Sequence, residues 1–267
     1  MELRLDHVVH FLHRTPAEAT DHFRQKGYHA VAGGRHAMWG TWNSLSYFGL
    51  SYVEFLAVEQ EELAKQSDNP LIRQLVGEQS RGEGLGQIAL RTQQMDWWAE
   101  KLQHAGLKVT GPVAGSRTRD DGTVIRWRML FLEDPRKGML PPFLIEWQES
   151  EDERRVDLKN RGVIAAHPNG AEAIQAVGYA VSDLEAAAKQ WESWFDWKRS
   201  EPYADDQLGA ICLRFEVPGG DIVLCQPRKE GKTQEALQKR GERPFFVQAS
   251  GGNAKAEDSV FGATYLL

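Results

Sequence analysis

The sequence predicts an α+β fold built from repeated units of one strand, one helix and three further strands. Three helix-forming segments each follow a strand-like run at a similar distance, and extended segments follow each helix. The first two units align almost without gaps, because His7 to Gly27 spans 20 residues and Gln87 to Gly106 spans 19. Each unit therefore has the order βαβββ.

The first unit covers about residues 1–65 and opens with the strand-like run LDHVVHFL. Its helix begins at Thr15, whose hydroxyl is suited to an N-cap, with Pro16 at the first helical position and Glu18 completing a capping box. Gly27 ends the helix. The segments YHAVAGG, TWNSLSYFG and SYVEFLAV then supply three strands.

The second and third units cover about residues 84–150 and 172–228. In the second, GQIALRT precedes the helix MDWWAEKLQHAG, and LKVTGPVAG, TVIRWRMLFLE and PPFLIEWQE follow it. In the third, IQAVGYAV precedes a helix that starts near Ser182, and GAICLRFEV and DIVLCQP are later strands. Polar linkers lie around residues 61–80 and 149–170.

The domain organisation follows from what one such unit leaves exposed. A single curved βαβββ sheet has an open concave apolar face, so two units are expected to pair around a shared cavity. We expect one domain at residues 1–150 made of two units. A second domain at 170–267 should hold the third unit and a C-terminal extension.

Composition restricts the class of partner and the compartment. The 267 residues are 41% hydrophobic and 26% charged, which is typical of a globular chain, and the net charge of -6 disfavours nucleic acid and anionic membranes. Cys212 and Cys225 lack metal-type spacing and favour a reducing compartment. The N-terminus has no signal-peptide pattern, and no apolar run is long enough to span a membrane. We therefore expect a cytoplasmic protein with a small-molecule partner, and a homodimer is one assembly that the third unit allows.

Paired βαβββ units with a histidine in the first strand and a glutamate in the last resemble the vicinal oxygen chelate superfamily. That superfamily includes glyoxalase I, extradiol dioxygenases and bleomycin-resistance proteins. Over residues 3–148, the segments LDHVVHF, GGRHAMWGTWNSLSYFGLSYVEFLAV and LPPFLIEW resemble its glyoxalase-like branch. The third unit resembles the fold only, since its corresponding positions are apolar or small.

Superposing the first two units places four polar residues in matched positions. His7 then lies opposite Gln87, and Glu54 lies opposite Glu146. Strand alternation turns His7 and Glu54 to the concave apolar side, where an unpaired carboxylate needs a cation, a proton or an arginine partner. The resemblance implies that these four residues bind one divalent ion, such as Zn, Ni, Co, Mn or Fe.

A structural interpretation of the same residues stays open. His7 is then a hydrogen-bonded core histidine, Gln87 is an amide at the edge of a strand, and each glutamate pairs with an arginine. The available partners are Arg35, Arg126 and Arg128. An extradiol dioxygenase is disfavoured, because its iron needs a second histidine where Gln87 stands.

A second group of polar residues is expected at the rim of the cavity. His36, Thr41 and Asn43 precede Glu54 on adjoining strands and are expected to face the same cavity, with Arg35 nearby to hold a carboxylate or phosphate. The alternative is a solvated hairpin loop. Arg126 and Arg128 share one face of their strand, either as a solvated face or as counter-charges for Glu146 or an anionic substrate. These two arginines and the four rim residues are the candidate substrate-binding residues.

Two functions fit this arrangement. The first is a metal-dependent isomerase or lyase acting on a small compound with two adjacent oxygen atoms, with Glu54 or Glu146 as the catalytic base. The second is a metal-free protein that binds and sequesters a small molecule. Its cavity would have an aromatic lining from Trp39, Trp42, Tyr47 and Trp147.

Overall fold

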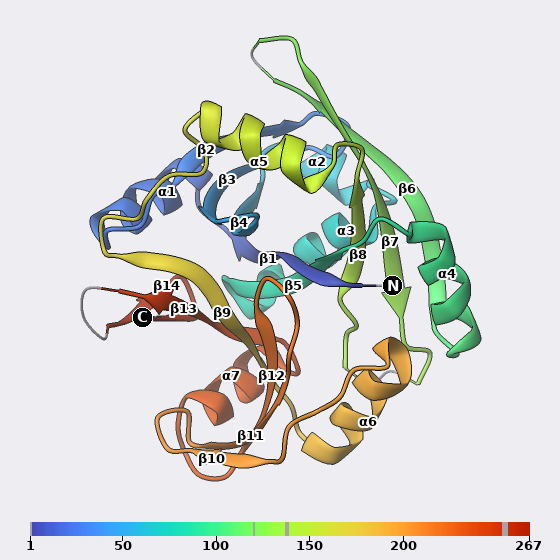
Figure 1. The fold of residues 1–267 in the computed structure, drawn as a ribbon, viewed down its shortest axis with the longest axis vertical. Helices are drawn as coiled ribbons and strands as arrows, with labels where there is room; N and C mark the ends of the chain where they lie inside the picture. Colours follow the sequence, from blue (N-terminus) through green and yellow to red (C-terminus); the bar gives the residue numbers. More distant parts are fainter. Residues whose placement is uncertain (1, 120, 137–138, 253–255) are drawn as a thin grey trace.

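The computed structural model describes residues 2–119, 121–136, 139–252 and 256–267 and confirms the expected α+β fold of repeated units (Figure 1). The first unit consists of β1 (Arg4–Leu12), α1 (Pro16–Gln25), β2 (Val31–His36), β3 (Thr41–Phe48) and β4 (Ser51–Val58). The second consists of β5 (Gly84–Arg91), α4 (Met95–His104), β6 (Lys108–Thr118), β7 (Val124–Glu133) and β8 (Phe143–Trp147). Between them lie α2 (Glu61–Lys65), α3 (Pro70–Gly77) and the 3-10 turn η1 (Gln79–Arg81), and α5 (Glu151–Asn160) follows.

The remaining elements form the other half of the molecule. The third unit consists of β9 (Ala171–Ala180), α6 (Leu184–Phe195), β10 (Tyr203–Asp205), β11 (Ala210–Phe215) and β12 (Asp221–Pro227). After it come α7 (Lys232–Arg240), β13 (Pro244–Gly251), β14 (Glu257–Val260) and β15 (Ala263–Leu266).

Helix α1 begins where the sequence predicts it. The Thr15 hydroxyl accepts a hydrogen bond from the Glu18 backbone N–H at 3.3 Å, and the Glu18 carboxylate accepts one from the Thr15 N–H at 2.9 Å. Both halves of the capping box are therefore present, and they satisfy backbone donors that the first helical turn leaves free. The buried side of α1, with Ala19 and Phe23, packs on the outer face of the first sheet.

The first two units together form one eight-stranded sheet, sheet A, in the order β2-β3-β4-β1-β5-β8-β7-β6. The opening strands β1 and β5 are antiparallel neighbours at its centre, and each pairs in parallel with the last strand of its own unit. The sheet curls so far that its two edge strands, β2 and β6, contact each other. We call this contact between β2 and β6 the seam; it nearly closes sheet A into a barrel.

The third unit and the last three strands form sheet B, in the order β10-β11-β12-β9-β13-β15-β14. Here β9 and β13 are the antiparallel central pair, and β15 runs parallel to β13 as β8 runs parallel to β5. The strands β13 to β15 thus repeat part of a fourth unit, and no helix lies between its strands in the residues that the structure describes. Small and apolar residues fill the inner face of sheet B, including Ala176, Cys212, Val223, Cys225 and Phe246.

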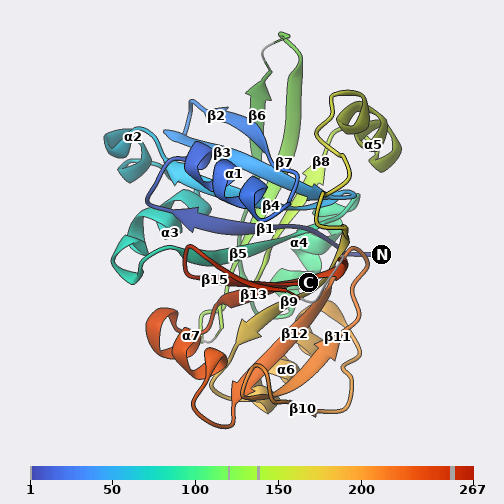
Figure 2. The same cartoon turned by 90° about the vertical axis from the view of Figure 1, so that its left-hand side faces the viewer.

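The two sheets share the largest hydrophobic core, and Figure 2 shows β13 and β15 beneath β1 and β5. One buried polar contact joins them at β1. The His10 ring donates from Nε2 to the Phe261 carbonyl oxygen at 3.0 Å, and its Nδ1 accepts a hydrogen bond from the Tyr265 hydroxyl at 2.8 Å. Burial lowers the pKa of His10 to about 4, so its ring is neutral at pH 7.

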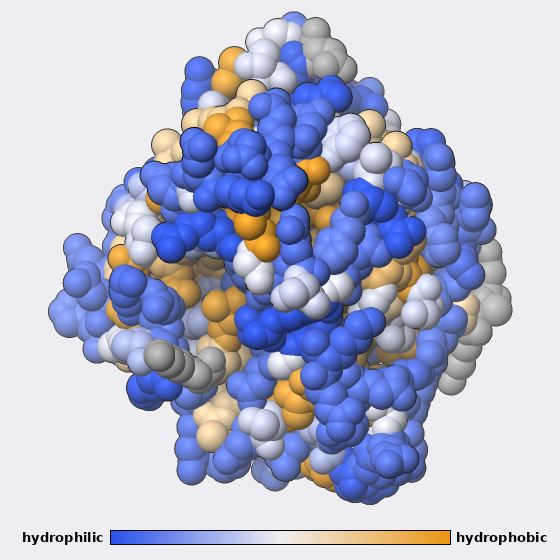
Figure 3. All heavy atoms as spheres, turned by 180° about the vertical axis from the view of Figure 1, so that it is seen from behind, coloured by the Kyte–Doolittle hydropathy of each residue, from blue (hydrophilic) through white to orange (hydrophobic). Residues whose placement is uncertain are grey.

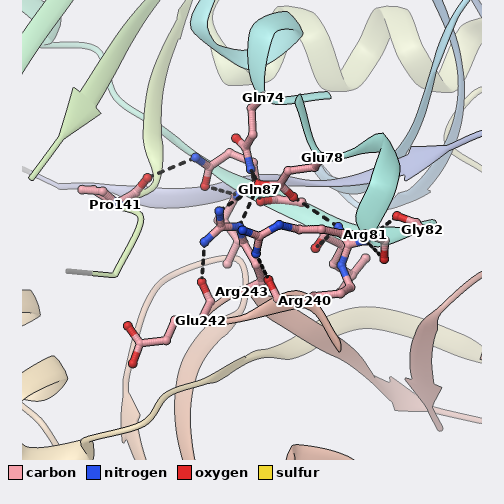
Figure 4. Close-up of polar contacts among 12 residues, drawn as sticks. Gln74, Glu78, Arg81, Gly82, Gln87, Pro141, Arg240, Glu242 and Arg243 are labelled. Atoms are coloured by element: carbon pink, nitrogen blue, oxygen red, sulfur yellow. Dashed lines mark hydrogen bonds and ion pairs between the residues drawn. The ribbon is translucent and has the colours of Figure 1, made fainter. Parts of the chain in front are cut away.

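A second polar contact joins α3 to the segment around α7 and β13 (Figure 4). Glu78 accepts hydrogen bonds from Arg243 at 2.8 Å and from Gln74 at 2.9 Å, and Arg240 lies 3.4 Å away. Because both Glu78 and Arg240 are buried, their pairing offsets part of the cost of removing them from water.

The surface opposite the view of Figure 1 is mostly hydrophilic, with apolar residues in scattered groups (Figure 3). Within the described ranges, none of the helices combines the length and the apolar character that a membrane crossing needs.

Candidate active site

Sheet A encloses a cavity of about 790 Å³ on its concave side. Its walls come from strands of both units, and α3 and α5 border it. This volume is in the range of sites for small organic molecules. The aromatic residues that line it are Trp39, Tyr47, Tyr52, Trp127, Phe143 and Trp147.

His7 lies in the cavity wall and is held by the preceding residue. Its Nδ1 lies 2.7 Å from Asp6 Oδ1, and the other oxygen of Asp6 accepts a hydrogen bond from the Trp147 indole N–H at 3.0 Å. Burial by itself would raise the pKa of Asp6, but the hydrogen bond from His7 and the charges of Arg154, His7 and Arg91 lower it to about 2. Asp6 is therefore ionised at neutral pH, so His7 donates from Nδ1 and directs Nε2 to the cavity side.

A break in the ladder between β1 and β5 allows neighbours in sequence to interact in this way. The register shifts between Leu5 and His7, and Leu5 packs in the core between the sheets, whereas Val9 faces the cavity side with His7. Regular alternation would place Leu5 and His7 on one face of the strand, and the irregularity instead places them on opposite faces.

Glu54 reaches His7 from the neighbouring strand β4. Its Oε2 lies 3.6 Å from His7 Nε2, and its Oε1 accepts a hydrogen bond from the Asn43 amide at 2.5 Å. Asn43 in turn accepts a hydrogen bond from the Gly34 N–H at 2.9 Å. A Cβ atom on Gly33 would lie 2.0 Å from the Asn43 amide oxygen, so glycine is required there for Asn43 to turn toward Glu54.

Aromatic rings fix the plane of the His7 imidazole. It stacks on Tyr52 with centroids 4.6 Å apart and meets the edge of Phe143 at 5.6 Å, while Tyr52 stacks on Tyr47 at 4.5 Å. Burial raises the pKa of Tyr47 to about 12 and that of Tyr52 well above its usual range, so both phenols stay protonated at neutral pH. The site thus combines a carboxylate, an imidazole and neutral phenols in an apolar wall.

The predicted rim residues are divided between the cavity and its support. His36 and Asn43 line the cavity, and Arg35 lines it while its exposed guanidinium pairs with Glu59 at 2.5 Å. Thr41 is fully buried and does not line the cavity; its hydroxyl lies 3.1 Å from His36 Nδ1. Burial lowers the pKa of His36, so this ring is neutral at pH 7.

The structure does not bring Gln87 and Glu146 to His7 and Glu54. Gln87 sits on β5 beside Gln74 and Glu78, donates to the Pro141 carbonyl at 3.1 Å, and does not line the cavity (Figure 4). Glu146 lies on the outer face of β8, where it accepts a hydrogen bond from Arg128 at 2.8 Å.

The register of the strands explains the position of Glu146. His7 and Gln87 are equivalent, because His7 pairs with Ala89 and Val9 pairs with Gln87. In the first unit Val9 pairs with Glu54, and in the second Ala89 pairs with Phe143. Phe143 is therefore the equivalent of Glu54. Glu146 lies three residues further on, and an odd offset turns it to the opposite face.

The two arginines of β7 also lie outside the cavity. Arg128 pairs with Glu146, as in the structural interpretation, and also with Asp96, and Arg126 is exposed. In the part of the chain that the structure describes, no cluster of three or more His, Cys, Asp or Glu residues could hold a metal ion. The expected four-residue metal site therefore does not fit this structure.

Several cavity residues escaped the sequence analysis. Asp6 had a signal, because an aspartate directly precedes the candidate histidine. Others come from segments without periodic patterns, among them Asn69, Arg117, Arg119, Arg154 and Arg161. Asn69 and Arg154 are buried, and each has a side-chain nitrogen without a hydrogen-bond partner in the described residues.

Two βαβββ units around one cavity define a protein of the vicinal oxygen chelate class, which confirms the resemblance seen in the sequence. The chain belongs to the glyoxalase-like domain family, whose model matches residues 5–195. A search of curated proteins gave no match.

Solved structures share the fold. A hypothetical protein from Staphylococcus aureus is similar over 99% of this chain and 98% of its own, with a TM-score of 0.77 and 20% identity. A mutant of 4-hydroxymandelate synthase from Streptomyces coelicolor is similar over 93% of this chain and 71% of its own, with a TM-score of 0.60 and 10% identity. At these identities the similarity concerns the fold.

Proposed function

We propose that this protein is a glyoxalase-like enzyme of isomerase, lyase or epimerase type. Its substrate is a small oxo or hydroxy compound with two adjacent oxygen atoms. The observation that carries the proposal is the pair formed by His7 and Glu54 in the wall of the cavity, with Asp6 behind the histidine.

The pair is arranged for proton transfer. Because His7 donates from Nδ1 to Asp6, its Nε2 presents a lone pair when the ring is neutral. Nε2 and Glu54 Oε2 are 3.6 Å apart, which is too long for a direct hydrogen bond, so a ligand oxygen can interact with both atoms. One of the two groups removes the proton next to the substrate carbonyl and, once protonated, returns a proton to the oxygen or the carbon of the resulting enolate.

Asn43 and the aromatic wall support this chemistry. The Asn43 amide donates to Glu54 Oε1, which leaves Oε2 directed at His7. The stacked Tyr52 and the edge of Phe143 hold the imidazole in one plane, so little reorganisation is needed when a proton moves. Because this wall is apolar, the developing charge interacts more strongly with His7 and Glu54 than it would in water.

The metal-dependent form of this function depends on four ligands, and two of them lie elsewhere. Gln87 is engaged by Pro141, and Glu146 is engaged by Arg128 on the outer face. We therefore assign the proton transfer to His7 and Glu54 and base no step on a metal ion.

Proton exchange tests the proposal directly. The protein is incubated in D₂O with small 2-hydroxy acids and their amides, such as mandelate, lactate, mandelamide and lactamide, and deuterium at C2 is measured by NMR. We expect exchange with wild type, and a loss of about a hundredfold or more in His7→Gln and Glu54→Gln. Glu146→Gln is the matched control, because this glutamate is on the outer face, and it should exchange at the wild-type rate.

A second candidate is a protein that binds a small molecule without turnover. It is favoured by the aromatic lining, because Trp39, Tyr47 and Trp147 line the cavity as expected. Trp42 instead packs against the hydrophobic core between the two sheets. Ligand binding without any exchange, unchanged in His7→Gln, would select this function. The cytoplasmic location and the homodimer remain predictions, which cell fractionation and the mass in solution test.

A further inference from the structure

Arg117 is a cavity residue to which neither the predicted site nor the proton-transfer pair gives a role. It is half-buried and lines the cavity, and its side chain forms no hydrogen bond or ion pair with any residue of the described ranges. The other arginines of the cavity wall are paired: Arg35 with Glu59, Arg119 with Asp157, Arg154 with Asp6, and Arg161 with both Asp121 and Asp157. A guanidinium that is partly withdrawn from water and has no carboxylate partner is free to pair with the negative charge of a ligand.

The seam places this guanidinium near the proton-transfer pair. Arg117 belongs to β6 of the second unit and crosses to β2 of the first, where a Cβ atom on Gly34 would lie 2.7 Å from Arg117 Nη1 and 2.8 Å from Cδ. Gly34 donates its N–H to Asn43, and Asn43 donates to Glu54. Arg117 is thus connected to Glu54 through only two intervening residues.

The two glycines of the seam therefore have separate roles. Gly33 leaves space for the amide of Asn43, and Gly34 leaves space for the side chain of Arg117. A side chain at either position would move a polar group that faces the cavity.

We propose that Arg117 binds the carboxylate of the substrate, which makes the substrate a small 2-hydroxy or 2-oxo acid. This rests on the proposed function for the placement of the second oxygen at His7 and Glu54. The planar guanidinium can donate two parallel hydrogen bonds to one carboxylate. The apolar part of the acid then lies against Trp39 and Trp127, whose ring centroids are 6.4 Å apart.

The charge balance favours a carboxylate over a phosphate. A phosphate monoester carries close to two negative charges at pH 7 and would need a second free cation. The remaining cavity arginines are already paired with carboxylates. One free guanidinium matches one carboxylate.

Calorimetric titration with matched acids and amides tests the assignment. Mandelate and lactate are compared with mandelamide and lactamide, which keep both adjacent oxygens and lose the charge. We expect wild type to bind the acids at least about tenfold more tightly than the amides, and Arg117→Gln to lose this preference while its affinity for the amides is unchanged. Gly34→Ala should weaken acid binding in the same way, because it displaces Arg117.

Arg126→Gln is the control variant, because Arg126 is exposed and lies outside the cavity. It should keep the preference for acids. A thermal melt of each variant verifies that it is folded before its affinity is compared. The proposal is overturned if amides bind as tightly as acids, if Arg117→Gln keeps the preference, or if none of the acids binds to wild type.

Deuterium exchange separates this inference from the proposed function. If the acids bind through Arg117 and no exchange occurs at C2, the proton-transfer function fails and the carboxylate assignment stands. If exchange proceeds equally on acids and amides, the function stands and the carboxylate assignment fails.

Discussion

Replacing Asp6 with asparagine should affect both stability and proton transfer. The buried carboxylate accepts from His7 and from the Trp147 indole, and its charge is balanced by Arg154. An asparagine of the same shape keeps one acceptor oxygen and places an N–H₂ group where the second oxygen was. His7 then faces a donor or loses its partner, so the tautomer with a free Nε2 is no longer favoured.

The structure gives the size and the pH dependence of the stability effect. Folding lowers the pKa of Asp6 from 3.8 to about 2, because the hydrogen bond from His7 and the nearby positive charges outweigh burial. A lowering of this size corresponds to about 2 to 3 kcal/mol of stability at neutral pH. The carboxylate contributes this stability above the unfolded pKa near 4, and loses it as the pH falls toward about 2.

Urea unfolding at pH 7, 5, 4 and 3 measures this contribution. We expect Asp6→Asn to be less stable than wild type by about 2 to 3 kcal/mol at pH 7, and the difference to shrink below pH 4. Deuterium exchange should fall by about a hundredfold or more in the same variant. Asp96→Asn is the control, because Asp96 is an exposed partner of Arg128, and it should change little.

Equal stability of Asp6→Asn and wild type at pH 7 would refute the reasoning on the buried carboxylate. A difference that stays constant down to pH 3 would show that the effect comes from packing and not from charge. Normal exchange in a folded variant would show that His7 does not depend on Asp6.

Three variants and one treatment test the site and its support further. Asn43→Ala should slow deuterium exchange about tenfold or more with only a modest loss of stability. Phe55→Ala, in the core between the sheets, should instead lower the stability by about 3 to 5 kcal/mol and leave the exchange rate of the folded protein unchanged. Equal losses of melting temperature in the two variants would contradict this difference. Gly33→Ala should reduce exchange as Asn43→Ala does, since its Cβ would lie 2.0 Å from the Asn43 amide oxygen; an unchanged rate would show that Asn43 is dispensable. Treatment with EDTA should leave both the melting temperature and the exchange rate unchanged, because the described residues include no cluster of three His, Cys, Asp or Glu side chains placed for a metal ion. A loss restored by added Zn, Ni, Co or Mn would contradict the assignment of proton transfer to His7 and Glu54 without a metal ion.

The elements of the fold were predictable from local signals. The capping box at Thr15 and Glu18 depends on neighbours within a few residues, and so does the alternation of side chains along β1 from His7 onward. The same alternation brought His7 and Glu54 to one face, because β1 and β4 are parallel partners within one unit.

The contribution of the second unit to the site depends on the register of its strands, which no local sequence pattern determines. Aligning β4 with β8 by their glutamates places Glu146 three residues away from Phe143, the true equivalent of Glu54. The place of Arg117 in the cavity wall could not be predicted from the sequence for another reason. Arg117 becomes a cavity residue only because sheet A curls until β6 touches β2, and this curl results from the packing of all eight strands.

The contact between His10 and Tyr265 ties β1, at the centre of sheet A, to a strand near the other end of the chain. His10 lies three residues after His7 on β1, and its hydroxyl partner is 255 residues further along the chain. Strand β1, which carries His7, therefore gains this contact late in biosynthesis, after nearly all of the described residues have been made. Such a long-range closure slows folding and delays the completed site until both sheets have docked.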